Sequence, residues 1–155
     1  MSPETPDRFR WFGRFTLAWT GAWCFDVSAA WRHAPYDRAG PAAAALWLVL
    51  LVLMPRTRPP ARLLLAAAWI GSLLGVMGEL HVARHLALVC AVCAWLPGIG
   101  LRLVAAAAAL SWMPALGWLL AAWSPSTVNA IRLIIPAVAL GAVLMRRVRH
   151  EPLLA

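Results

Sequence analysis

Charged side chains are scarce in this chain of 155 residues, because only 13% are charged while 63% are hydrophobic. A soluble globular domain carries about 25% charged residues. With a mean hydropathy of +0.73, too few polar side chains remain to cover a water-facing globule, and a disordered chain is excluded for the same reason. We therefore expect a membrane protein with the lipid bilayer as a partner.

Lysine is absent altogether, so the net charge of +8 comes from 14 arginines set against 6 acidic residues. In a soluble chain, such an excess would indicate binding to nucleic acid. Here the arginines lie mostly between apolar runs, where basic residues set the orientation of a membrane protein. We interpret the charge as a topology signal and expect no nucleic-acid partner.

Cysteine is also rare, and Cys24, Cys90 and Cys93 all lie inside apolar segments. This placement excludes the disulfide framework of a small secreted domain. The opening segment MSPETPDRFRWFGRF contains acidic residues and no early apolar core. We therefore expect no cleaved signal peptide, and we expect the first apolar segment to stay in the mature protein.

Six apolar runs are separated by charged or Pro-rich breaks, and they predict an all-α fold, a polytopic transmembrane helical bundle of about six helices. We expect residues 1–14 to form a cytoplasmic segment, residues 15–145 the transmembrane domain and residues 146–155 a cytoplasmic basic tail. The runs are 15–31, 39–54, 63–78, 86–96, 103–123 and 127–145.

The lengths of these runs differ in how well they match a bilayer, which takes roughly 20 helical residues to cross. The run 103–123 reaches that length unaided. The run 86–96 is the shortest, and it crosses only if the helix also includes His81 to His85. Pro114 and Pro136 lie inside apolar runs, where we expect them to kink a helix without ending it.

The arginines are unequally divided between the two sides of a six-span topology. Four of the 14 fall on one side, Arg32, Arg38, Arg84 and Arg132, and the other ten fall on the side that holds both termini. The positive-inside rule makes the richer side cytoplasmic. We therefore expect a bacterial inner-membrane protein with both termini in the cytoplasm, while four spans with two re-entrant segments remain an alternative.

Most of the other ionisable and polar residues lie in three loops on the opposite side, which we expect to face one compartment. Close helix approach is expected in the segment WIGSLLGVMG, because its glycines are spaced four and three residues apart. The polar groups of the three loops are Arg32, His33, Tyr36, Asp37 and Arg38; Glu79, His81, Arg84 and His85; and Ser124, Ser126, Asn129 and Arg132.

Histidines are the first candidates for a site, because His81 and His85 are four residues apart and share one face of a helix. Such a pair can hold a metal when a third ligand arrives, for which His33, Asp37 or Glu79 are candidates. The alternative is interfacial histidines that bind water, headgroups or a carbonyl.

Asp26 is an intramembrane carboxylate, with either a proton or substrate role or a structural pairing with Arg32 or Arg84.

Cys90 and Cys93 form a C-x-x-C pair, a spacing found in redox couples. Membrane disulfide oxidoreductases carry a second cysteine pair, whereas this chain has only Cys24 left over. We interpret the two cysteines as small apolar residues one turn apart.

The segments WRHAPYDRAGPAAAALWLVLLVLMPR and SWMPALGWLLAAW resemble the amino-terminal half of the exosortase and archaeosortase family of membrane transpeptidases. Tyr36-Asp37-Arg38 departs from the family's Tyr-Ser-His-Gly loop. In a second register, VNAIRL is similar to the family's Asn-x-x-Arg, which matches Asn129 and Arg132. Cys90 and Cys93 both lack the family's Cys-Ser-Gly context. We favour the first register, which implies a family-like half without the catalytic half.

Three functional hypotheses follow. The first is a non-catalytic accessory or scaffold subunit that packs against other membrane proteins, with no cofactor. The second is an exosortase-like cysteine transpeptidase, in which Cys90 or Cys93 is the nucleophile and Arg132 stabilises the oxyanion. The third is a small carrier or metal-binding protein that uses Asp26, Glu79, His81 and His85.

Overall fold

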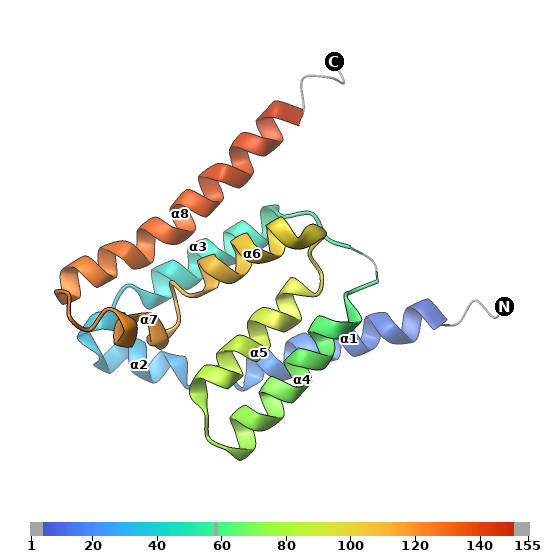
Figure 1. Cartoon of the computed structure of the whole chain (residues 1–155), viewed down its shortest axis with the longest axis horizontal. Coiled ribbons are helices and arrows are strands. Elements are labelled where there is room, and N and C mark those ends of the chain that lie inside the picture. Colours follow the sequence, from blue (N-terminus) through green and yellow to red (C-terminus); the bar gives the residue numbers. More distant parts are fainter. Residues whose placement is uncertain (1–4, 58, 151–155) are drawn as a thin grey trace. The chain divides into compact units, whose positions relative to one another are not determined.

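A computed structural model describes residues 5–57 and 59–150, with side chains for 9–57 and 59–146, and every regular element in these ranges is helical (Figure 1). The all-α prediction is confirmed. The elements are α1 (Thr5–Ala22), α2 (Val27–His33), the 3-10 helix η1 (Pro35–Asp37), α3 (Gly40–Leu53), α4 (Arg62–Met77), α5 (His81–Cys93), α6 (Gly98–Ala109), α7 (Pro114–Leu119) and α8 (Pro125–His150).

The chain forms two compact units. The first unit comprises Met1–Ala29 and Pro55–Ala106, and the second comprises Ala30–Met54 and Ala107–Ala155. The expected cytoplasmic segments 1–14 and 146–155 fall partly on residues 1–4 and 151–155, which lie outside the described residues. Arg58, one of the expected topology arginines, lies outside them as well.

In the first unit, α4 and α5 pack side by side, and α1 packs against both (Figure 1). Glycines of α4 permit the close approach. A Cβ atom on Gly71 would lie 3.4 Å from the Cβ of Ala87, and one on Gly75 would lie 2.6 Å from Cγ of Arg84. The predicted close approach along WIGSLLGVMG therefore occurs between α4 and α5.

Tryptophans and hydroxyl groups join α1 to α4. Trp19 donates from its indole nitrogen to the Ser72 hydroxyl at 2.9 Å, and Trp69 donates to the Thr16 hydroxyl at 3.0 Å. The two indole rings stack with centroids 5.9 Å apart. These paired hydrogen bonds satisfy the polar atoms of an otherwise apolar contact.

In the second unit, α3 and α8 lie side by side (Figure 1). Both helices carry small and aliphatic side chains that are fully enclosed, Ala43 and Leu50 on α3 and Val128 on α8. The Trp47 and Trp112 rings pack with centroids 5.5 Å apart. Pro136 lies inside α8 and is fully buried, so this proline remains within a helix as expected.

Two of the predicted runs are not continuous helices. The run 15–31 is interrupted by a turn over residues 23–26, between α1 and α2. The run 103–123 is divided into α6 and α7. The expectation for Pro114 was wrong, because Met113 is extended and Pro114 starts α7 rather than kinking one long helix. Proline restricts the residue before it to extended geometry and fits the first turn of a new helix.

Two described helical segments have the length and composition needed to cross a membrane, Pro35–Leu53 and Pro125–Arg146. In Pro35–Leu53, 33% of the most apolar 18-residue stretch is buried inside the protein, and in Pro125–Arg146 the share is 22%. Shorter apolar helices are Arg62–Met77, His81–Cys93 and Gly98–Ala109. The run 86–96 was expected to cross a bilayer only if its helix also included His81 to His85. The corresponding helix, α5, does begin at His81.

Candidate functional site

In the second unit, the side chain of Arg132, in the second turn of α8, is fully enclosed, with 0% exposure. The residues before it favour a helix start at this place. Ser124 accepts a hydrogen bond from the backbone N–H of Thr127 at 3.3 Å, and Pro125 occupies the first position of α8. A capping hydroxyl followed by proline is a usual helix start.

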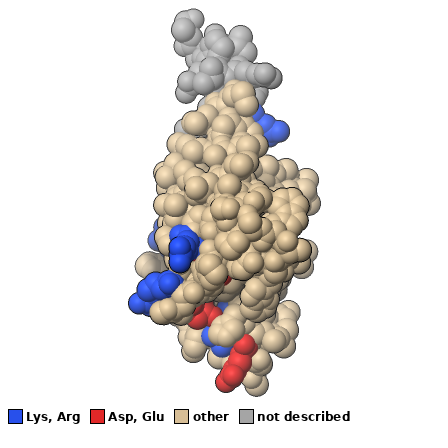
Figure 2. All heavy atoms as spheres, turned by 90° about the vertical axis from the view of Figure 1, so that its left-hand side faces the viewer, with Lys and Arg blue, Asp and Glu red and all other residues tan. Residues whose placement is uncertain are grey.

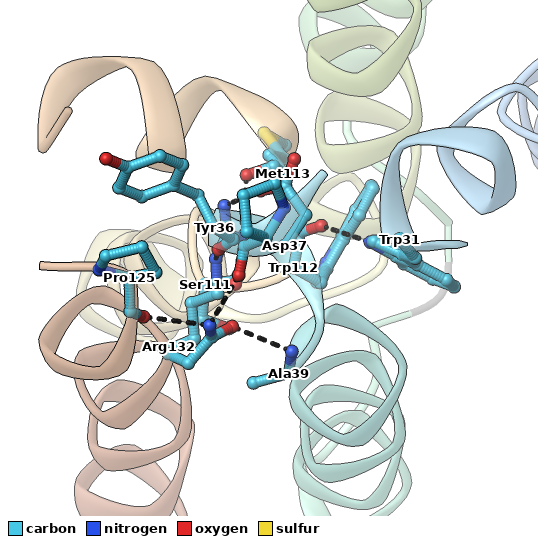
Figure 3. Close-up of polar contacts among 11 residues, drawn as sticks. Trp31, Tyr36, Asp37, Ala39, Ser111, Trp112, Met113, Pro125 and Arg132 are labelled. Carbon is cyan, nitrogen blue, oxygen red and sulfur yellow. Dashed lines mark hydrogen bonds and ion pairs between the residues drawn. The ribbon is translucent and has the colours of Figure 1, made fainter. Parts of the chain in front are cut away.

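The Arg132 side chain is held by an ion pair and by three backbone carbonyls. Its Nη2 donates to Oδ1 of Asp37, whose side chain is 5% exposed. Its Nε donates to the Tyr36 carbonyl at 2.9 Å, and its Nη1 donates to the carbonyls of Ser111 at 2.7 Å and Met113 at 2.9 Å (Figure 3). The charge is thus enclosed by groups that compensate its loss of hydration.

The carbonyls of Ser111 and Met113 are available because α6 ends at Ala109 and Pro114 starts a separate helix. Both carbonyls lie outside the two helices, and a carbonyl oxygen can accept two hydrogen bonds, so that of Met113 accepts from Arg132 as well as from the Leu116 N–H at 3.2 Å. The break in the run 103–123 therefore supplies two of the acceptors that Arg132 needs. Sequence reasoning missed this role of Pro114.

Asn129, one turn before Arg132, bonds to the backbone on both sides of η1. Its Oδ1 accepts from the Ala39 N–H at 2.8 Å, and its Nδ2 donates to the Pro35 carbonyl at 2.9 Å. Nδ2 also donates to the Pro125 carbonyl at 2.8 Å within α8. One amide therefore fixes the link between α2 and α3 against the start of α8.

Gly117 closes the site from α7. A Cβ atom there would lie 3.0 Å from Oδ1 of Asp37 and 3.2 Å from Nη2 of Arg132. Glycine lets the α7 backbone pass close to the ion pair, whereas an added Cβ atom would push against both of its side chains. Among the predicted candidates, Asp37, Asn129 and Arg132 come together here, whereas Gly117 had no signal in the sequence.

A second polar cluster lies in the first unit, and we call Asp26, His81, Arg84 and His85 the Asp26 cluster. Oδ2 of Asp26 pairs with Nδ1 of His81 and lies 3.9 Å from Nη1 of Arg84, and Oδ1 lies 3.3 Å from Nε2 of His85. Asp26 is in the turn after α1, outside the helices.

The other metal candidates do not join this cluster. His33 is exposed at the end of α2 and belongs to the second unit. Glu79 is exposed between α4 and α5, with a left-handed backbone at φ 53°. Within the side chains that the structure describes, no group of three His, Cys, Asp and Glu residues is arranged to hold a metal ion.

All three thiols are free, and two of them act as hydrogen-bond donors. Cys93 is buried and donates to the Arg102 carbonyl at 3.5 Å, while Cys24 donates to the Arg84 carbonyl at 3.5 Å. Cys90 is half-buried. Cys90 and Cys93 therefore sit as two separate thiols on α5.

The three predicted polar loops divide between the two units. The loop after α2 meets the start of α8 in the second unit, through Asp37 and Arg132. The loop before α5 supplies His81, which meets Asp26 in the first unit. The chain matches no protein-family profile, no curated protein and no solved structure.

Proposed function

We propose that the chain is a multi-pass integral membrane protein of about six membrane-crossing segments, a non-catalytic subunit of a larger membrane assembly. One observation carries the proposal. Large apolar side chains point outward along both helices of membrane-crossing length, including Val52 at 71% and Val138 at 66% exposure. Large apolar side chains exposed along a whole helix are covered by lipid or by a partner protein.

The distribution of charge supports the same placement. Uncharged residues cover most of the face drawn in Figure 2, and charged side chains are few on it. Ten of the 14 arginines belong to segments that a six-span topology puts on the side of the termini. We place that side in the cytoplasm of a bacterial inner membrane, by the positive-inside rule.

The internal use of the polar groups supports a structural role. The guanidinium of Arg132 donates hydrogen bonds to Asp37 and to backbone carbonyls, so its partners are protein atoms. A cysteine transpeptidase needs a thiolate with a base or cation beside it. Cys93 instead acts as a donor to a carbonyl, which requires the protonated thiol.

The experiment is deletion and complementation in the source organism, with membrane assemblies separated by native electrophoresis in mild detergent. We expect the tagged chain to migrate with a partner in fixed stoichiometry, and we expect that assembly to disappear on deletion. A chain that migrates alone, with every assembly intact in the deletion strain, contradicts the proposal.

Cysteine variants separate a subunit from an enzyme in the same strain. Cys90→Ala and Cys93→Ala are expected to restore the assembly as well as the native chain does. A variant that inserts at the native level and fails to restore it would assign the cysteine a chemical role and support the transpeptidase hypothesis instead.

A further inference from the structure

The Asp26 cluster has a graded exposure to solvent that the proposed function does not use. The His81 side chain is 61% exposed, the Asp26 side chain 23% and the His85 side chain 3%. The carboxylate lies between the two imidazoles, with Oδ2 toward His81 and Oδ1 toward His85. The order of contacts thus runs from water to the interior of the first unit.

The surroundings favour the ionised carboxylate in the middle position. His81 is the first residue of α5, so Asp26 faces the N-terminal turn of a helix, where negative charge is stabilised. Nη1 of Arg84 lies 3.9 Å from Oδ2. Arg84 is itself fixed, because its Nε donates to the Gly75 carbonyl at 2.8 Å and its guanidinium lies 5.8 Å from the centre of the Trp23 ring.

The charged and titratable groups that face the carboxylate come from two elements. α5 contributes His81, Arg84 and His85, and the turn after α1 contributes the thiol of Cys24, which donates to the Arg84 carbonyl. α4 contributes the uncharged Gly75 carbonyl through Arg84.

We propose that Asp26, His81 and His85 form a proton relay, a site that takes protons from water at His81 and delivers them through Asp26 to the buried His85. Nδ1 of the His81 imidazolium gives its proton to Oδ2 of Asp26, which becomes a neutral carboxylic acid. Rotation about the Cβ–Cγ bond presents the protonated oxygen to Nε2 of His85. The carboxylate is then regenerated, and one positive charge has moved from His81 to His85. The same steps in reverse return the proton from His85 through Asp26 and His81 to water, so the relay exchanges protons between the buried imidazole and solvent.

The same side chains fit a proton better than a metal ion. A metal site needs at least three ligand groups directed at one point, and the described side chains hold no such group. A relay needs only consecutive donor and acceptor atoms within hydrogen-bond reach. Asp26 provides one oxygen for each imidazole.

The test is nuclear magnetic resonance of the ring nitrogens in the full chain, labelled with ¹⁵N-histidine in detergent micelles, across the pH range near the ordinary histidine pKa of about 6.5. Asp26→Asn keeps the shape of the side chain but cannot carry the proton. We expect it to slow proton exchange at His85 by about 100-fold. His81→Gln is expected to slow the exchange less, because part of Asp26 is open to water.

Glu79→Gln is the matched control, since it also removes one carboxylate, at an exposed position two residues before His81. It is expected to leave the exchange at His85 unchanged. Equal exchange rates at His85 in the native chain, Asp26→Asn and Glu79→Gln overturn the relay. Should Asp26→Asn fail to fold, an unchanged rate in His81→Gln overturns it in the same way.

Discussion

At the residue scale, Arg132 shows what an apolar helix requires in order to keep a charge. An unpaired charge in such surroundings costs several kcal/mol, and it stays ionised only with a counter-ion and a full set of hydrogen bonds. Asp37 supplies the counter-ion, and the carbonyls of Tyr36, Ser111 and Met113 supply the acceptors. These residues are far apart in sequence, so the arginine fixes three segments of the second unit at once.

Replacement of this arginine should therefore destabilise the protein. Arg132→Met keeps most of the side-chain volume but leaves Asp37 unpaired and three carbonyls without their donor. We expect a loss of about 3–5 kcal/mol in the free energy of unfolding, measured by denaturant titration of the purified protein in detergent. Arg38→Ala removes an exposed arginine next to Asp37 and should change stability by less than about 0.5 kcal/mol. Equal losses in the two variants would refute the anchoring role.

At the residue scale, the sequence singled out several of the polar groups that the structure brings together. Asp37, Asn129 and Arg132 were all candidates, because ionisable and amide groups in an apolar chain are conspicuous. Their partners were not predictable, since carbonyls carry no signal in the sequence. Asp26 was expected to have either a proton or substrate role or a structural pairing with Arg32 or Arg84. Its carboxylate lies 3.9 Å from Arg84 and closer to the two histidines.

At the element scale, the apolar runs of the sequence predicted where helices lie better than they predicted where each helix begins and ends. The runs 39–54 and 63–78 correspond to α3 and α4 within one residue at each end. The breaks at 23–26 and 110–113 were missed, because a single polar residue, Asp26 or Ser111, in an apolar run does not change the periodicity in a way that would mark a turn. At Pro114 the kink and the break were both compatible with the sequence, and the acceptors needed by Arg132 favour the break.

The tight contact between α4 and α5 predicts that a substitution at Gly75 is destabilising. Gly75→Ala should weaken it, since a Cβ atom would lie 2.6 Å from Cγ and 2.9 Å from the backbone nitrogen of Arg84. We expect a loss of about 1–3 kcal/mol, typical of overpacking. Thermal unfolding followed by circular dichroism in detergent measures it.

Gly141→Ala in α8 is the comparison, because nothing lies within 4 Å of the added Cβ atom. Alanine favours a helix over glycine by about 0.8–1.0 kcal/mol, so this variant should be as stable as the native chain or more so. A destabilised Gly141→Ala together with an unaffected Gly75→Ala would reverse the assignment of the tight contact.

At the scale of the whole molecule, the arginine distribution predicts which loops share a side of the membrane. In a background without the native cysteines, Thr57→Cys lies in the arginine-rich loop before α4, and Ser126→Cys is exposed at the start of α8. A membrane-impermeant maleimide should label the cysteine at 126 in intact spheroplasts and the one at 57 only after permeabilisation. Labelling of both cysteines from outside would contradict the six-span arrangement.

The central claim is that the molecule resides in a bilayer. It explains the apolar composition of the chain, the outward apolar side chains of α3 and α8 and the enclosure of Arg132. Alkaline carbonate extraction of membranes from cells that express the chain tests it most directly, with mild detergent applied to the pellet afterwards. We expect the protein to stay in the pellet through carbonate and then to be released by detergent as a folded species. Release by carbonate, or recovery in the soluble fraction before extraction, would contradict it.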